Sequence, residues 1–285
     1  MEISTKTMRY KVRLKLAVLA LLVHVSTCRN IRKLFGNNLH RNPHTHGATE
    51  MSGDPSLDIS AIRDQVHGVK MGIPLTACDD GVHGIEMDWN PNSVEEITCF
   101  ASDIINDGIP SLNITDFSDE IPMHICLDSP IKYTTDLPLS GSHRPLWPKF
   151  GEYKYLPPQR WVHSLEHGAV ALLYHPCMRE EPELAALKSL VRDCLGKHVI
   201  TPYRNIPLHM PYAVLTYKHG LLIGAFEPKF EDDVNLVIEF IKKYALEAPE
   251  THVLKDGQYS AGLVQSATKF SDLKETKENL CAFLK

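Results

Sequence analysis

The chain has 285 residues, of which 30 are Lys or Arg and 35 are Asp or Glu, giving a net charge of −5 at neutral pH. An acidic chain without a basic stripe argues against nucleic acid as the main partner. The length suits one domain of moderate size with additional arms, or at most two domains.

Residues 1–28 have the organisation of a secretory signal peptide. Five basic residues precede an apolar stretch at 16–25, and small residues follow it at the expected cleavage position. That stretch has about ten residues, whereas a membrane span needs about 20. No later run approaches that length, so we expect a protein of the secretory lumen or the extracellular space without a membrane span in its mature chain. A retained signal anchor is the alternative.

Six cysteines remain once the leader with Cys28 is removed: Cys78, Cys99, Cys126, Cys177, Cys194 and Cys281. An even number in a secreted chain favours disulfides, although six cysteines allow about 15 pairings. None has a C-x-x-C spacing, so neither a redox pair nor a zinc knuckle is indicated. Asn113, followed by Ile and Thr, is a glycosylation acceptor if its loop is exposed in the lumen.

The rest of the chain divides by composition. Residues 29–55 are polar and predict a mobile arm. Residues 56–120 predict an irregular N-terminal extension tied by disulfides, with one helix at 93–105. Residues 251–285 predict a polar C-terminal tail.

Residues 121–250 predict an α+β domain. Its first part, 121–160, is dense in Pro and aromatic residues, so we expect an ordered loop over the core. The remainder predicts a compact sheet with helices packed on one face. Apolar runs of strand length occur at 169–175, 197–201, 212–217 and 221–226, the last two as a hairpin around His219 and Gly220. Amphipathic helices are predicted at 183–195 and 232–245.

A histidine motif lies at the centre of this domain. Pro158 and Gly168 bracket a short helix of about two to three turns. Residues three and four apart on a helix are neighbours, so His163, Glu166 and His167 share one face. Two imidazoles and a carboxylate on one face make most of a transition-metal site.

The motifs of this region resemble domain of unknown function 3105. The resemblance rests on Tyr133, Pro138 and the Ser-Gly-Ser-His run at 140–143, then Gly-Glu-Tyr at 151–153, Val-His-Ser-Leu-Glu-His-Gly-Ala-Val at 162–170 and Tyr-His-Pro at 174–176. It covers about residues 121–250. It implies no enzymatic activity, and it implies that the family's shared polar positions are His143, His163, Glu166 and His167. Among animal members the chain is similar to the p53-inducible type, regarded as a membrane-associated growth suppressor with a C-terminal span.

The leading hypothesis is a zinc or copper site in a non-catalytic protein. His163 and His167 from the helix and His143 from the loop are the ligands, and Glu166 is a fourth ligand or orients one imidazole. His209 and Met210 are possible additional ligands, which would shift the preference toward copper. The alternative for these histidines is structural: His167 complements the helix dipole and His163 forms a hydrogen bond in the core.

Two other function classes remain open. The H-x-x-E-H spacing is that of inverted zinc peptidases, with Glu166 as general base and Glu239 or Glu247 as the distant acidic ligand. Against it, the helix is short and ends at Gly168. A Ser164 or Cys177 nucleophile is disfavoured, because Ser164 lies on another helix face and Cys177 is expected in a disulfide. The remaining class is an extracellular structural or partner-binding domain, with the aromatic residues of the loop at 133–155 as contacts to an unidentified protein partner.

Overall fold

The apolar run that follows the histidine motif forms strand β5 (Val170–Tyr174), which lies in the middle of a seven-stranded sheet. All five of its residues are buried, because successive side chains of a strand point to opposite faces and both faces are covered here. Val170 and Leu172 enter one hydrophobic cluster, whereas the intervening Ala171 enters another. The predicted buried strand is confirmed, and it carries core side chains on both sides.

The computed structural model describes residues 59–103, 109–267, 275–282 and 284. The expected signal peptide at 1–28 and the polar arm at 29–55 lie outside this part of the chain. Within it, the other strands are β1 (Arg63–Asp64), β2 (Gly68–Val69), β3 (Leu112–Thr115), β4 (Gly151–Tyr153), β6 (His198–Pro202), β7 (Tyr212–Thr216), β8 (His219–Ile223) and β9 (Leu263–Ser266). The α-helices are α1 (Pro158–Glu166), α2 (Pro182–Cys194) and α3 (Glu231–Tyr244).

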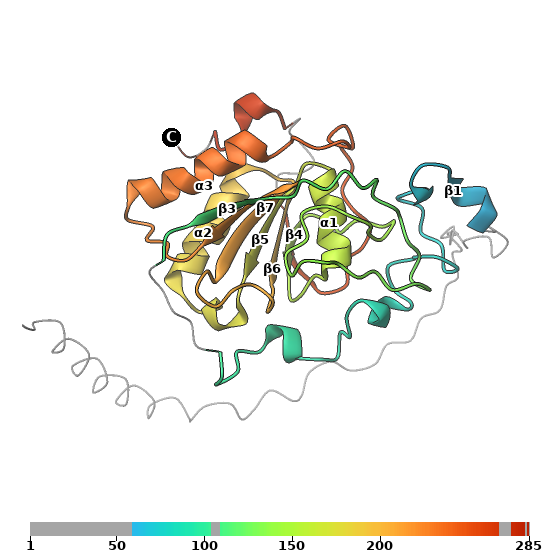
Figure 1. Ribbon diagram of the computed structural model, residues 1–285, viewed down its shortest axis with the longest axis horizontal. Helices are drawn as coiled ribbons and strands as arrows, with labels where there is room; N and C mark the ends of the chain where they lie inside the picture. Colours follow the sequence, from blue (N-terminus) through green and yellow to red (C-terminus); the bar gives the residue numbers. More distant parts are fainter. Residues whose placement is uncertain (1–58, 104–108, 268–274, 283, 285) are drawn as a thin grey trace, which may run out of the picture. The chain divides into compact units, whose positions relative to one another are not determined.

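The large sheet has the strand order β3-β8-β7-β5-β6-β4-β9 (Figure 1). β6 runs parallel to both of its neighbours, β5 and β4, and the other neighbouring strands are antiparallel. This mixed sheet with its helices confirms the predicted α+β class. As predicted, α2 and α3 share one face of the sheet, but α1 packs on the opposite face together with the preceding loop.

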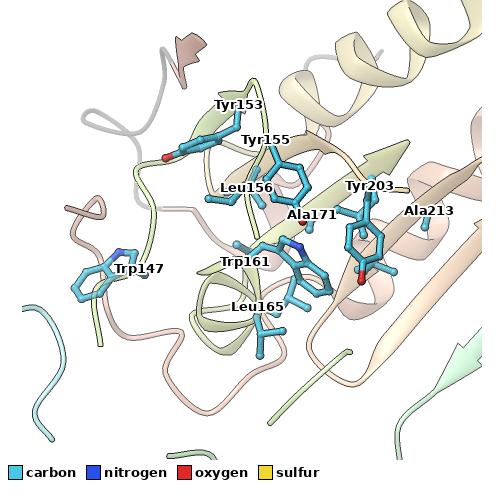
Figure 2. Packing of buried hydrophobic residues seen from close by; sticks show 14 of the residues in the cluster. Trp147, Tyr153, Tyr155, Leu156, Trp161, Leu165, Ala171, Tyr203 and Ala213 are labelled. Carbon is cyan, nitrogen blue, oxygen red and sulfur yellow. The ribbon is translucent and has the colours of Figure 1, made fainter. Parts of the chain in front are cut away.

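The Pro- and aromatic-rich loop packs over the core, as predicted, and lies on the same face of the sheet as α1 (Figure 2). Four of its aromatic side chains are at most 5% exposed: Trp147, Phe150, Tyr153 and Tyr155. They pack in one cluster with Trp161 of α1, and such large rings supply much of the buried apolar area. These side chains are therefore core residues and do not form the contact surface that the partner-binding alternative requires.

α1 begins and ends where the sequence predicts. Pro158 occupies the first turn, where a missing N–H is no loss. Gly168 follows the helix with φ = 81°, a left-handed conformation that favours glycine. Its N–H donates to the carbonyl of Leu165 (2.9 Å), which closes the helix end. The chain then enters β5, so the histidines of α1 are held over one face of the sheet.

Replacing Gly168 by alanine should destabilise the fold by more than about 2 kcal/mol. A β-carbon there would lie 2.6 Å from Cγ2 of Thr251 and 2.9 Å from Cα of Leu246, in addition to the strain of a positive φ. Gly84 is the matched control, because its φ is 72° but the nearest atom to its β-carbon is 3.9 Å away. Gly84→Ala should cost about 1 kcal/mol. Denaturant unfolding of both variants measures the difference, and equal costs would contradict the close approach at Gly168.

The helix predicted at 93–105 is wrong. Only a single 3₁₀ turn, η3 (Glu95–Ile97), forms in its described part, and Thr98 after it is extended. The Thr98 carbonyl, which a longer helix would use internally, instead accepts a hydrogen bond from Arg204 (2.5 Å), 106 residues away. A long-range side-chain contact thus overrides the local helical periodicity.

The predicted hairpin forms, but its turn is displaced. Thr216 pairs with His219, so the turn residues are 217 and 218, and His219 and Gly220 lie within β8. Gly220 has a packing role instead: a β-carbon there would lie 2.8 Å from Cγ1 of Ile114 on β3. The glycine therefore allows the close approach of an edge strand and does not form a turn.

All six expected cysteines are paired, which confirms the disulfide prediction. The bonds are Cys78–Cys126, Cys99–Cys177 and Cys194–Cys281. The first two join the segment at 59–103 to the domain. Two buried ion pairs reinforce this attachment, namely Asp79 with Arg160 of α1 and Asp88 with Arg144.

Candidate metal centre

Four buried histidines from two segments gather beside the sheet. α1 supplies His163 and, at its C-terminal cap, His167, with ring centroids 4.7 Å apart because residues four apart share a helix face. The preceding loop supplies His124 and His143, which pair through an isolated parallel bridge. His124 is 6% exposed and the other three are fully buried.

The backbone fixes the protonated nitrogen in three of these rings. In each, Nδ1 lies within hydrogen-bond distance of one carbonyl oxygen: Val69 for His124 (2.8 Å), Gly141 for His143 (2.8 Å) and Arg144 for His163 (2.6 Å). Because a carbonyl oxygen only accepts, Nδ1 must donate. In the neutral ring Nε2 then carries a free lone pair, which is the arrangement of a metal-ligating histidine.

These three rings converge on one another. One ring nitrogen of each lies within 4.8 Å of those of the other two. The centroids of His143 and His163 are 4.3 Å apart, and that of His124 is 5.0 Å from each. Nε2 of His143 and Nε2 of His163 are buried without a hydrogen-bond partner. Buried unpaired polar atoms are costly, and a zinc ion satisfies such nitrogens at about 2.0–2.1 Å.

Glu166 faces this group. Its Oε2 lies 3.2 Å from Nε2 of His143, although the geometry is not that of a hydrogen bond. An ionised carboxylate and an unprotonated Nε2 are both acceptors, so this contact needs a proton or a cation between them. Burial, followed by the charge of Glu250, raises the pKa of Glu166 to about 7. A metal ion can displace the proton that this carboxyl carries for part of the time at neutral pH.

A second group shares His163. Ligand atoms of His163, His167 and Glu250 lie within 4.8 Å of one another. Nε2 of His167 donates to Oε2 of Glu250 (3.1 Å), which leaves its Nδ1 as a buried lone pair without a hydrogen-bond partner. Glu250 follows α3 in the chain. Its N–H donates to the carbonyl of Glu166 (3.1 Å), and this hydrogen bond holds Glu250 beside α1. The site thus extends from buried histidines to a half-buried carboxylate.

Burial keeps all four imidazoles neutral at neutral pH. It is the largest cause that lowers their pKa values, and for His143 and His163 it lowers them well below the usual range. Neighbouring rings lower the pKa values of His124, His143 and His163 further, because like charges repel. Burial acts to raise the pKa of Glu250, but the hydrogen bond from His167 and the charges of His167, His124 and His67 together outweigh it, and the pKa is lowered. Neutral imidazoles beside carboxylates are the forms that bind a metal cation.

The metal-free protein should lose stability as the pH falls from 7 to 5. A histidine with a lowered folded-state pKa stays neutral in the fold but takes up a proton in the unfolded chain below about pH 6.5. Each such histidine then contributes a loss of up to about 1.4 kcal/mol per pH unit. Glu166 offsets the loss from one of these histidines. Its pKa is raised, so the folded state takes up a proton at Glu166 more readily than the unfolded chain does. Guanidinium unfolding at both pH values measures the net effect, and equal or higher stability at pH 5 would contradict it.

The structure places some of the predicted ligands in the histidine cluster and others outside it. The structure brings together His143, His163, Glu166 and His167. His209 is exposed and belongs to neither histidine group of the described chain. Met210 is 7% exposed and packs in the hydrophobic cluster with the aromatic residues.

Sequence reasoning missed His124 and Glu250. His124 lies in a stretch without periodicity and reaches the site only through its long-range pairing with His143. A local cue is Cys126, whose disulfide fixes the backbone two residues after His124. The distant acidic ligand was expected to be Glu239 or Glu247, but both are exposed. Glu250 is the carboxylate that lies beside His163 and His167.

Fold and site together define a class: an α+β domain with a buried histidine cluster that one helix and one loop share. The family model described as protein of unknown function (DUF3105) matches residues 124–257, which confirms the predicted resemblance for this part of the chain. The match begins at His124 and includes all four histidines and both glutamates. Among curated proteins and solved structures, nothing matches the chain. None of the helices in the described ranges is sufficiently long and apolar to cross a membrane.

Proposed function

We propose that the protein is non-catalytic and secreted or lumenal, and that it holds a transition-metal ion, zinc or copper, between His124, His143 and His163. One observation carries this proposal. Each of the three buried rings donates Nδ1–H to a main-chain carbonyl. Each neutral ring therefore keeps a free lone pair on Nε2, which is available to a metal ion. An outer hydrogen bond of this kind normally fixes the tautomer and orientation of a metal-bound histidine.

Glu166 is the proposed fourth ligand, because its carboxylate already faces Nε2 of His143. Three imidazoles and one carboxylate suit tetrahedral zinc. The six cysteines expected in the mature chain are all in disulfides, so they supply no thiolate for copper(I). His209, which would have favoured copper as a further ligand, is exposed. Zinc is therefore the better match, and copper(II) is second.

The proposed compartment is an oxidising one. Three disulfides in the described chain are typical of secreted and lumenal proteins. Asn113, the proposed glycosylation acceptor, is exposed on β3, which pairs only with β8 in the described sheet. A glycan at this edge would also hinder pairing with a strand of another chain.

Unfolding experiments on the metal-free full chain, with and without Zn²⁺, test the proposal. Zinc that binds only the folded state should stabilise it by about 2.7 kcal/mol at a free concentration of 100 times Kd. The same measurement with Cu²⁺ separates the two metals. A transition that neither ion shifts at neutral pH, where the imidazoles are neutral, would contradict the proposed function.

A zinc hydrolase is the second candidate function. The specific observation in its favour is the group of His163, His167 and Glu250, which combines the H-x-x-E-H histidines with a distant carboxylate. Against it, Glu166 is only 5% exposed and faces His143, which leaves little room for a substrate. If this function is correct, Glu166→Gln abolishes peptidase activity while zinc binding persists. Activity that survives the substitution rules out this role of Glu166.

A further inference from the structure

The two ligand groups compete for a single atom. Nδ1 of His163 donates to the carbonyl of Arg144, so His163 has only Nε2 to offer. One lone pair binds one cation at a time. The inner group (His124, His143, His163) and the outer group (His163, His167, Glu250) therefore describe two alternative positions of one ion, and they do not describe a pair of separately filled sites.

The two positions differ in access to solvent and in charge. The three rings of the inner group are buried and neutral. In the outer group, the Glu250 side chain is 15% exposed, the most exposed of the five ligands, and carries a carboxylate. A partly exposed carboxylate attracts a hydrated cation, whereas neutral buried rings do so only at short range.

We infer, on the basis of the proposed function, that the outer group is the entry position through which an ion reaches the inner group. Nε2 of His163 stays bound throughout the transfer. His167 and Glu250 release the ion as His124 and His143 take their places, so no bare cation has to cross the low-dielectric interior. Glu250 is thus a positioning residue for loading and is not a ligand of the final site.

His67 marks the competing route. Its ring centroid lies 5.8 Å from that of His124, and its side chain is 35% exposed. It belongs to neither histidine group. An ion that entered on this side would meet His124 first and would not need Glu250. His67→Ala is therefore the control, because it removes an ionisable side chain that also acts on Glu250 through its charge but belongs to neither ligand group.

The experiment measures the rate and the extent of zinc uptake separately. Metal-free full-length chains with intact disulfides are mixed with Zn²⁺, the reaction is stopped with chelator at increasing times, and bound zinc is counted. Glu250→Gln, which keeps an acceptor for Nε2–H of His167, should slow uptake by about tenfold or more because electrostatic steering is lost. The final stoichiometry should remain one zinc per chain, and His67→Ala should load like the wild type.

Each other outcome overturns the inference. Equal uptake rates for wild type and Glu250→Gln remove the entry role of Glu250 and leave the metal site in place. Slow uptake by His67→Ala alone assigns entry to a path past His67 and His124 that does not use Glu250. Two zinc ions per wild-type chain contradict the shared use of His163. If the wild type takes up no zinc or copper at all, the proposed function fails, and the inference fails with it.

Discussion

His163→Ala should abolish high-affinity metal binding. His163 belongs to both ligand groups, and its ring centroid lies 4.3 Å from that of His143 and 4.7 Å from that of His167. We expect the affinity for zinc to fall by at least about 100-fold, because losing an outer-shell partner alone typically costs 10- to 100-fold. The stabilisation by zinc, about 4.1 kcal/mol at 1,000 times the wild-type Kd, should largely disappear. Equilibrium zinc titration followed by denaturant unfolding measures both effects.

His198→Ala provides the control for the truncation itself. His198 is also buried and also donates Nδ1–H to a carbonyl, that of Leu195 (2.7 Å), but it belongs to neither ligand group. Both variants lose a buried ring and one hydrogen bond. Only His163→Ala should lose the response to zinc. Stoichiometric, tight zinc binding by His163→Ala would show that the cluster does not hold the ion.

Asp79→Ala should cost about 3–5 kcal/mol of stability, the largest structural effect that we expect. Its carboxylate accepts from Nη1 (2.6 Å) and Nη2 (3.0 Å) of Arg160, and the two side chains are at most 1% exposed. Removing the carboxylate leaves a buried guanidinium without its counter-charge. It also removes the acceptor of the Leu146 N–H (3.2 Å). Guanidinium unfolding with intact disulfides measures the loss.

A surface ion pair calibrates this result. Lys277 lies 3.0 Å from Glu247, but the two side chains are 31% and 62% exposed. Exposed pairs are typically worth about 0–1 kcal/mol, so Glu247→Gln should change the free energy of unfolding little. This variant keeps Lys277, whose Nζ also donates to the carbonyls of Lys242 and Lys243. If Asp79→Ala also costs less than about 1 kcal/mol, the buried pair does not hold the N-terminal segment to α1 as described.

The N-terminal segment matters for the site as well as for stability. It lies before the residues matched by the family, yet its Val69 carbonyl fixes the tautomer of His124. The Arg144 side chain reinforces the connection, because it binds Asp88 of that segment and the carbonyls of Ile125 and Cys126 beside His124. The ring orientations in the candidate metal centre therefore depend on both parts of the chain.

Local patterns predicted the elements whose ends and faces are set locally. Pro158 and Gly168 bracket α1, and the apolar run after them is β5. The spacing of His163 and His167 placed both rings on one face, which the structure shows. These features follow from helical periodicity and backbone conformation, which a single sequence reveals directly.

The remaining features depend on contacts between distant residues. His124 and Glu250 reach the site through pairings with His143 and with the Glu166 backbone, which leave no periodic trace in the sequence. The helix expected at 93–105 does not form for the same reason, since the Thr98 carbonyl accepts a hydrogen bond from Arg204. Tertiary contacts decide these positions, and local propensity does not.

Elemental analysis of the full chain, purified without chelator, tests the central claim most directly. The account predicts one zinc or copper ion per chain in the wild type, retained on dialysis, and none in the combined variant His143→Ala, His163→Ala. His198→Ala should keep the ion. A wild-type protein that contains neither metal, and that retains neither after soaking and dialysis, would contradict a metal centre at these histidines.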